Sequence, residues 1–191
     1  HGLTASSPTC IFKNTRSHAI IIDNMPYAEV IGDPIAHSKS PIIHKFWLEK
    51  CNIEADYRAS YVTPDDLASY IEQRRLDQNW RGCNVTIPHK LAIMDHVDDP
   101  GNVRSSIGAM NTIARDDNGK LFGTNTDAGG FYAPIADYPF EGEEIVVVGA
   151  GGAARAVLFA LSRINVKSVT IINRNALKAS ALLASFGLKG R

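Results

Sequence analysis

The sequence lacks an excess of charge, a long apolar run and a regular set of cysteines. Its 20 lysine and arginine residues balance 20 aspartate and glutamate residues, so charge gives no reason to expect a nucleic-acid or membrane partner. No apolar run reaches the roughly 18 residues of a membrane-spanning helix. Cys10, Cys51 and Cys83 have neither CxxC nor zinc-ligand spacing. We therefore predict reduced thiols, a cytoplasmic location and no metal site.

Residues 1–24 differ from the rest of the chain. They show no clear amphipathic period, and no basic region precedes a long apolar one as in a signal peptide. We interpret them as a leader that is either artificial or poorly ordered, with Met25 as the natural start. The alternative is a genuine extra edge strand around residues 19–22, where an alanine precedes three isoleucines.

Residues 25–127 are predicted to form an α/β domain, because short apolar runs alternate with helical segments. The Asn118-Gly119 pair between two strand-like runs predicts a β-hairpin. The expected strands cover residues 27–32, 55–62, 82–86, 109–115 and 120–123, and the expected helices 41–51, 64–75 and 88–97.

The helix expected at residues 41–51 has a typical start, with Ser40 as N-cap and Pro41 at the first helical position. Its apolar side is expected to carry Ile42, Ile43, Phe46 and Trp47.

Residues 128–191 repeat a different pattern, strand–helix–strand–helix, after a connecting helix at residues 128–136. This order is half of a doubly wound nucleotide-binding sheet, so we expect a partial Rossmann domain that lacks roughly 60–100 residues. The run at residues 144–148 is apolar and β-branched, which predicts a strand buried on both faces. The other expected elements are helices at 153–163 and 176–186 and a strand at 168–172.

A glycine-rich turn joins the first of these strands to its helix. Gly149, Gly151 and Ala154 fit the pattern G-x-G-x-x-A in the correct strand and helix context. The glycines permit a tight turn and let the backbone approach a pyrophosphate. The alternative is a glycine-rich turn without a ligand. The predicted cofactor residues of the turn are Gly149, Ala150, Gly151, Gly152 and Ala153.

The end of the next strand indicates which dinucleotide binds. An NAD site would carry an acidic residue there, whereas this chain has Asn173 and Arg174, with Lys178 one helical turn later. A neutral residue followed by cations suits a 2′-phosphate, so we predict NADP as the cofactor. The alternative is that both cations are solvated surface charges.

Lys90 and Asp127 are the candidates for proton transfer. Reduction of a ketone builds negative charge on oxygen, which a lysine can stabilise and protonate while a carboxylate holds its ammonium group. Polar residues at strand ends surround the pair, although such residues often only cap helices or hold turns. His37, His44 and His89 show neither zinc spacing nor a nucleophile motif, so we expect them to be structural or solvated. The polar neighbours are Asn84, Thr86, Asn111, Asn125 and Thr126.

Taken together, these motifs resemble those of the shikimate dehydrogenase family. Residues 27–44 look like the opening of that family, and the resemblance extends to about residue 186. The matching motifs are N-V-T-x-P-x-K at 84–90, A-x-N-T at 109–112, N-T-D at 125–127, G-A-G-G-A at 149–153 and N-R at 173–174.

The resemblance implies a substrate-binding domain at residues 25–127, the first half of a Rossmann NADP-binding domain at 128–191, and an active site in the cleft between them. It implies reversible reduction of 3-dehydroshikimate to shikimate by NADPH, in aromatic amino-acid biosynthesis. Lys90 would be the acid/base, paired with Asp127. Ser38 and Ser40 would bind the substrate carboxylate, and the ring hydroxyls would be held by Asn84, Thr86, Asn111 and Asp127.

Two further functions stay open. One is a quinate/shikimate dehydrogenase of broader specificity, and the other is a chain that binds the hydroxy acid without turnover. Since later segments of the family are absent, we expect this chain to be much less active than a full-length relative. The expected partner is the small-molecule substrate, with no nucleic acid and no membrane, and a homodimer is left open.

Overall fold

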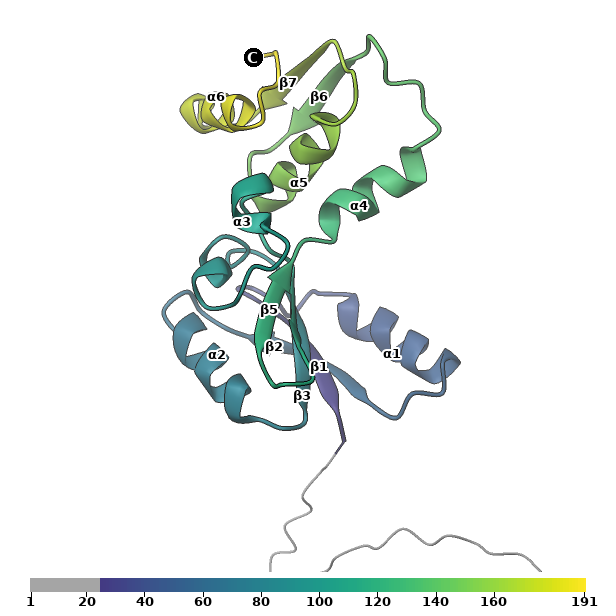
Figure 1. Cartoon of the computed structure of the whole chain (residues 1–191), viewed down its shortest axis with the longest axis vertical. Helices are drawn as coiled ribbons and strands as arrows, with labels where there is room; N and C mark the ends of the chain where they lie inside the picture. The colour runs from purple at the N-terminus through teal and green to yellow at the C-terminus, as the bar shows by residue number, and fades with distance from the viewer. Residues whose placement is uncertain (1–24) are drawn as a thin grey trace, which may run out of the picture.

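The computed structural model of the chain describes residues 25–191, so the predicted leader and the alternative strand at residues 19–22 lie outside the described part. Figure 1 shows two lobes. One is built around a five-stranded sheet and the other around a two-stranded sheet. The chain passes from the first to the second between residues 124 and 127, close to the predicted domain division, which stays a prediction.

The five-stranded sheet has the order β2-β1-β3-β4-β5. β1 pairs in parallel with β2 and β3, whereas β4 is antiparallel to both β3 and β5. The β4–β5 pair is the hairpin predicted from Asn118-Gly119. The strands are β1 (Tyr27–Gly32), β2 (Asp56–Tyr61), β3 (Trp80–Val85), β4 (Thr112–Arg115) and β5 (Leu121–Thr124).

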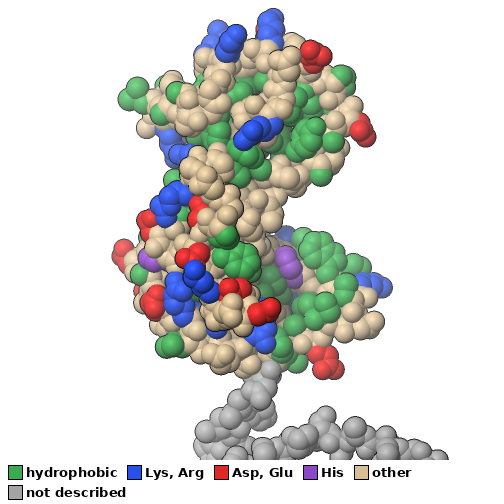
Figure 2. Space-filling model, viewed as in Figure 1, with side chains coloured by type: hydrophobic (Ala, Val, Ile, Leu, Met, Phe, Trp, Pro, Cys, Tyr) green, Lys and Arg blue, Asp and Glu red, His purple; other side chains and the backbone are tan. Residues whose placement is uncertain are grey.

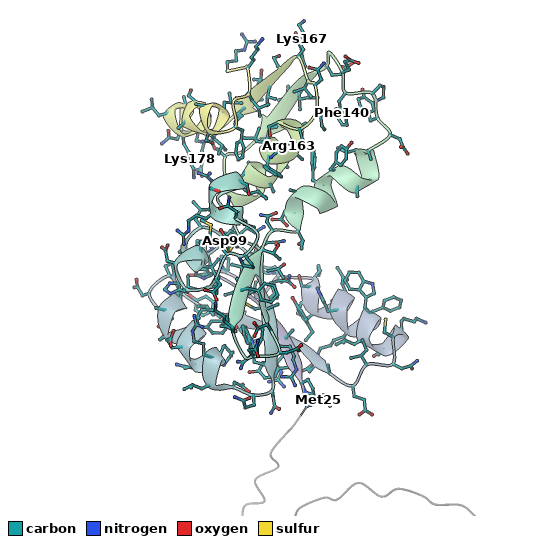
Figure 3. The ribbon with its side chains drawn as sticks, in the orientation of Figure 1. Met25, Asp99, Phe140, Arg163, Lys167 and Lys178 are labelled. Carbon is teal, nitrogen blue, oxygen red and sulfur yellow. The ribbon has the colours of Figure 1, made fainter. Side chains whose placement is uncertain are left out.

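Helices α1 (Ser40–Lys50) and α2 (Leu67–Leu76) lie on opposite sides of this sheet (Figure 1). The α2 side holds the main core, in which Ile71 and Trp80 are fully buried. Two short elements follow β3, the 3₁₀ helix η1 (Ala92–Asp95) and α3 (Val103–Ser106). Asp99, labelled in Figure 3, accepts hydrogen bonds from the first backbone N–H groups of α3.

The core beside α2 encloses a carboxylate. Glu29 on β1 is 2% exposed and lies 2.8 Å from Arg74 Nε on α2. Ser60, Tyr70 and Trp80 also donate hydrogen bonds to it. Burial alone would raise the pKa of Glu29, but the hydrogen bonds from Arg74, Ser60 and Tyr70 outweigh it and lower the pKa.

The second lobe confirms the predicted strand–helix–strand–helix order. β6 and β7 pair in parallel in register, and α5 and α6 pack on them through a core that includes Leu158 and Leu182. Within residues 25–191, no helix has the length and apolarity needed to cross a bilayer. The elements are α4 (Asp127–Tyr132), η2 (Ala133–Ile135), β6 (Glu144–Val148), α5 (Gly152–Leu161), β7 (Ser168–Ile172) and α6 (Ala176–Ser185).

The start of α1 differs from the prediction. Lys39, and not Ser40, is the N-cap residue, and Ser40 is already helical. The backbone N–H of Ser40 donates instead to Ser38 Oγ at 3.3 Å, so Ser38 supplies the side-chain acceptor at the start of the helix.

The expected apolar side of α1 is also not buried. Ile42, Ile43, Phe46 and Trp47 are 68%, 44%, 54% and 55% exposed, since α1 packs mainly on the edge strand β2. Figure 2 shows hydrophobic side chains at the surface over α1.

Three other predictions were wrong in detail. The segment at residues 88–97 forms turns and η1 rather than an α-helix. The helix expected from residue 64 begins at Leu67, because Thr63 and Asp66 first close a turn through their side chains. β6 is not buried on both faces: Val146 and Val148 are 60% and 80% exposed, since α5 covers only one face within the described residues.

Candidate functional site

The predicted substrate residues lie on four segments that meet at one edge of the five-stranded sheet. β1 and β3 run in parallel, so the segments after them leave at the same edge. β4 starts at that edge and β5 ends there, because each is antiparallel to its predecessor. Backbone hydrogen bonds from Asp33 to Ile87 (3.0 Å) and from Met110 to Lys90 (2.8 Å) tie the segments together.

Lys90 and Asp127 form an ion pair at this edge. Lys90 Nζ lies 2.5 Å from Asp127 Oδ2, although 37 residues separate them in sequence. The side chains are only 13% and 29% exposed, so solvent screens their interaction less than that of a surface pair. The ammonium group is thereby held at a fixed point, from which it can donate a proton to a bound oxygen atom.

Asn111 holds the other oxygen of the carboxylate. It is 8% exposed, and its Nδ2 donates to Asp127 Oδ1 at 2.7 Å and to Thr126 Oγ1 at 2.8 Å. Its Oδ1 accepts from the backbone N–H of Thr126 at 2.9 Å. The amide therefore fixes the turn from β5 into α4, and both of its N–H groups are already used within the protein.

Asn84 lies between two side chains that the sequence did not predict as site residues. Its Oδ1 accepts from Tyr57 OH at 2.5 Å, and its Nδ2 donates to Thr112 Oγ1 at 3.2 Å. Thr112 could have been found from its place beside Asn111 in the matched motif. Tyr57 carries no local signal, because it is 27 residues from Asn84 in sequence.

A groove of about 480 Å³ runs between α1 and the sheet and reaches Asn84 and Thr112 from the side away from α2. Neither Lys90 nor Asp127 lines it, so it is separate from the ion pair.

Thr86 approaches the end of β1 closely: a Cβ atom on Gly32 would lie 2.7 Å from Thr86 Cγ2. Glycine at position 32 thus allows the loops after β1 and β3 to pack together.

Ser38 lies in the loop between β1 and α1, and Ser40 is the first residue of α1, at the same edge of the sheet. Both are partly exposed, and the hydrogen bond from the Ser40 backbone to Ser38 Oγ holds them in one turn. Two neighbouring hydroxyl groups at a helix start are suited to an anionic group such as a carboxylate.

The glycine-rich turn fits a dinucleotide. Gly149 has φ of 103°, a conformation that glycine adopts readily, and α5 begins at Gly152. A Cβ atom on Gly149 or Gly151 would meet no atom within 4 Å, so the outer side of the turn is open. Ala154 is buried in the core beneath. Open space at a helix N-terminus after a tight turn is what a pyrophosphate requires.

The same turn lies against the predicted proton donor. A Cβ atom on Gly152 would lie 3.1 Å from Lys90 Cβ and 3.2 Å from Lys90 Cδ. The glycine turn of the second lobe and the lysine of the first therefore lie side by side.

The predicted 2′-phosphate residues lie at the end of β7, beside the glycine turn. The backbone N–H of Gly149 donates to Ile172 O at 2.9 Å, which joins the two strand ends. Asn173 Nδ2 donates to the backbone of Asn175, whose own side chain caps α6 by accepting from the Lys178 backbone. Arg174 and Lys178 are exposed, and Figure 3 shows Lys178 on α6.

The three histidines have no arrangement that suits catalysis. His89 is 1% exposed, with its Nε2 2.7 Å from Val62 O, and the His44 ring stacks on the Tyr57 ring with 3.9 Å between centroids. His37 is exposed. Within the described range 25–191, no three His, Cys, Asp or Glu side chains are grouped so that they could hold a metal ion.

Two family models match the chain. The model described as "Shikimate dehydrogenase substrate binding domain" matches residues 30–113, and the model described as "Shikimate / quinate 5-dehydrogenase" matches residues 135–190. The first runs from within β1 to within β4, and the second covers β6 to α6, including the glycine turn.

Individual relatives give the same result. A shikimate dehydrogenase (NADP(+)) from Sphingopyxis alaskensis is 65% identical over 165 residues, which are 86% of this chain and 60% of that protein. The solved structure of Thermus thermophilus shikimate 5-dehydrogenase with NADP(H) and shikimate has a TM-score of 0.77 and 38% identity, covering 87% of this chain and 63% of that one. A Gluconobacter 5-ketofructose reductase has a TM-score of 0.74 and 31% identity, covering 87% and 61%. The chain thus spans about 60% of the length of the curated relatives that it matches.

Proposed function

The chain belongs to the shikimate dehydrogenase family, and we propose that it takes part in the reversible reduction of 3-dehydroshikimate to shikimate with NADPH. The observation that carries the proposal is the pair of Lys90 and Asp127, 2.5 Å apart, with the glycine turn packed against the lysine. A proton donor and a dinucleotide turn are then adjacent, as reduction of a carbonyl group requires.

NADPH, held at residues 149–153 when bound, would supply the hydride for the carbonyl carbon. Lys90 donates the proton that converts the developing oxyanion into a hydroxyl group, and it takes a proton from the same hydroxyl in the reverse direction. Asp127 holds the ammonium group in position through Oδ2, while Asn111 holds Oδ1. After each reduction Lys90 regains its proton from solvent, to which its side chain is 13% exposed.

The polar residues at the edge of the five-stranded sheet would bind the carboxylate and hydroxyl groups of the substrate. Ser38 and Ser40 would bind the carboxylate, and the ring hydroxyls would lie near Asn84, Thr86, Asn111 and Asp127. Both N–H groups of Asn111 are already donated, so a ring hydroxyl there would share or replace one of these hydrogen bonds. Asn84 keeps one N–H group and one lone pair free of the bonds to Tyr57 and Thr112.

NADP would bind along the second lobe, with its pyrophosphate at residues 149–153. Asn173, Arg174 and Lys178 would hold the 2′-phosphate, because both cations are exposed and no acidic residue follows β7 directly. We also propose a cytoplasmic location, with Cys51 and Cys83 as free thiols.

A second candidate is a reductase of broader specificity. One matching family model is described as shikimate/quinate, and a structural neighbour is named a 5-ketofructose reductase. Both names describe oxidoreductases of polyhydroxylated ketones or alcohols. Comparison of initial rates with shikimate and quinate would separate the two candidates. The third candidate function is binding of the hydroxy acid without turnover.

The test is a Lys90→Ala variant of the chain, assayed for NADPH formation from shikimate and NADP, with shikimate binding measured by calorimetry. We expect the rate to fall by about 10²–10⁴-fold with little loss of binding. Lys120→Ala is the control, because Lys120 pairs with Asp98 and its side chain is 68% exposed. This variant should leave the rate of NADPH formation and the shikimate affinity unchanged. An unchanged rate in Lys90→Ala would refute the assigned role.

A further inference from the structure

We propose that Tyr57 and Thr112 are positioning residues for the Asp127–Lys90 pair, acting through one continuous chain of hydrogen bonds that crosses the sheet. The effect on substrate binding rests on the function proposed above, whereas the chain of hydrogen bonds itself does not.

The chain of hydrogen bonds starts at Tyr57 on β2 and ends at Asp127 at the start of α4. Tyr57 OH donates to Asn84 Oδ1 (2.5 Å), and Asn84 Nδ2 donates to Thr112 Oγ1 (3.2 Å). Thr112 Oγ1 donates to Asn111 Oδ1 (3.1 Å), and Asn111 Nδ2 donates to Asp127 Oδ1 (2.7 Å). Each donor group therefore faces an acceptor that leads one step closer to the carboxylate.

The chemistry of the groups at the Asp127 end fixes this direction. An ionised carboxylate only accepts and a backbone N–H only donates, so Asn111 must turn its nitrogen to Asp127 and its oxygen to the Thr126 backbone. Thr112 can then only donate to that oxygen, which leaves its own lone pairs for Asn84 Nδ2. The amide oxygen of Asn84 consequently needs a donor on its other side, and the Tyr57 hydroxyl is that donor.

Tyr57 is held firmly enough to serve as the fixed end. It is 4% exposed, and the His44 ring stacks on it at an interplanar angle of 10°. Burial raises the pKa of its hydroxyl group, so the group remains a donor at any ordinary pH. Hydrogen bonds linked in one direction polarise one another, so loss of the first bond weakens those that follow it.

The first test needs no ligand. Side-chain amide signals of Asn84 and Asn111 are recorded by ¹⁵N NMR in the wild-type chain, in Tyr57→Phe and in Tyr27→Phe. Tyr27 is the matched control, because it is also buried and its hydroxyl donates to Asp77 at 2.6 Å, outside the series of hydrogen bonds from Tyr57 to Asp127. We expect Tyr57→Phe to shift both amide signals and Tyr27→Phe to leave them in place. An unshifted Asn111 signal in folded Tyr57→Phe would overturn the proposal.

The second test measures shikimate affinity by calorimetry. Tyr57→Phe and Thr112→Val should each weaken binding about threefold to tenfold, and Thr112→Ser, which keeps the hydroxyl, should restore it. Adding Tyr57→Phe to an Asn111→Ala variant should cost no further affinity, because the series of hydrogen bonds is already broken at Asn111. Equal losses in both backgrounds would show a merely structural role and overturn the proposal. If the wild-type chain binds no shikimate, the proposed function fails, and the NMR result alone decides this inference.

Discussion

Gly152, in the glycine turn of the second lobe, lies against the aliphatic part of Lys90, the predicted proton donor. A Cβ atom on Gly152 would lie 3.1 Å from Lys90 Cβ, closer than side chains normally pack. The missing side chain at position 152 therefore sets how near the cofactor turn can come to Lys90.

We predict that Gly152→Ala weakens shikimate binding by about threefold or more, because the added methyl group pushes on Lys90 and, through the ion pair, displaces the Asp127 carboxylate that is proposed to hold a ring hydroxyl. Gly130→Ala is the control: its Cβ would meet nothing within 4 Å, and alanine is the better residue in α4. That variant should bind shikimate normally and gain about 0.5–1 kcal/mol in stability. Calorimetry and urea unfolding measure the two effects, and wild-type affinity in Gly152→Ala would contradict the account.

We predict that Glu29→Gln lowers the free energy of unfolding by about 3 kcal/mol, because Arg74 then keeps a partly buried charge without its partner. The pKa of Glu29 is lower in the folded than in the unfolded chain. Its stabilisation is therefore present above the unfolded pKa, about 4.3, and is lost as pH falls through the folded pKa.

Acid unfolding monitored by circular dichroism tests this pH dependence, since the Glu29→Gln variant should lose less stability than wild type below about pH 4.3. Glu72→Gln, at an exposed pair with Arg75 on α2, should change stability by no more than about 0.5 kcal/mol. A Glu29→Gln variant as stable as wild type at neutral pH would refute the prediction.

We predict that Arg115→Ala destabilises the chain by about 1–2 kcal/mol. Arg115 Nη2 donates to the carbonyl oxygens of Arg74 (2.5 Å), Arg75 (3.2 Å) and Asp77 (3.1 Å), where α2 ends and its last carbonyls lack helical partners. Arg81→Ala removes an exposed arginine of β3 and should be nearly neutral. Thermal unfolding compares the two, and equal melting temperatures would contradict the assigned capping role.

Local patterns predicted much of this fold. The hairpin at Asn118-Gly119 and the turn at Gly149 depend on backbone conformations that these residues favour over short distances. The polar residues at the sheet edge could be predicted as a group, because parallel strands end together. The placement of Ser40 inside α1 could not be predicted, since Ser38 competes for the same helix end.

Contacts between distant segments could not be read from the sequence. The sequence around Tyr57 does not show that its hydroxyl contacts Asn84, because this contact depends on the order of the strands in the sheet. The sequence around Glu29 likewise does not indicate that Arg74 is its partner. The apolar residues of α1 predicted a buried face, but burial depends on what packs there. In the described part of the chain, Phe46 and Trp47 remain half exposed.

A calorimetric titration of shikimate into the wild-type chain and the Asp127→Asn variant tests whether the Lys90–Asp127 pair forms the substrate site. The control is Asp98→Asn. Asp98 Oδ2 lies 2.9 Å from Lys120 Nζ, and this ion pair is much more exposed to solvent than that of Lys90 and Asp127. We expect one shikimate per chain, at least about tenfold weaker binding in Asp127→Asn and unchanged binding in Asp98→Asn. Absence of binding in the wild-type chain, or equal affinity in all three proteins, would contradict this expectation.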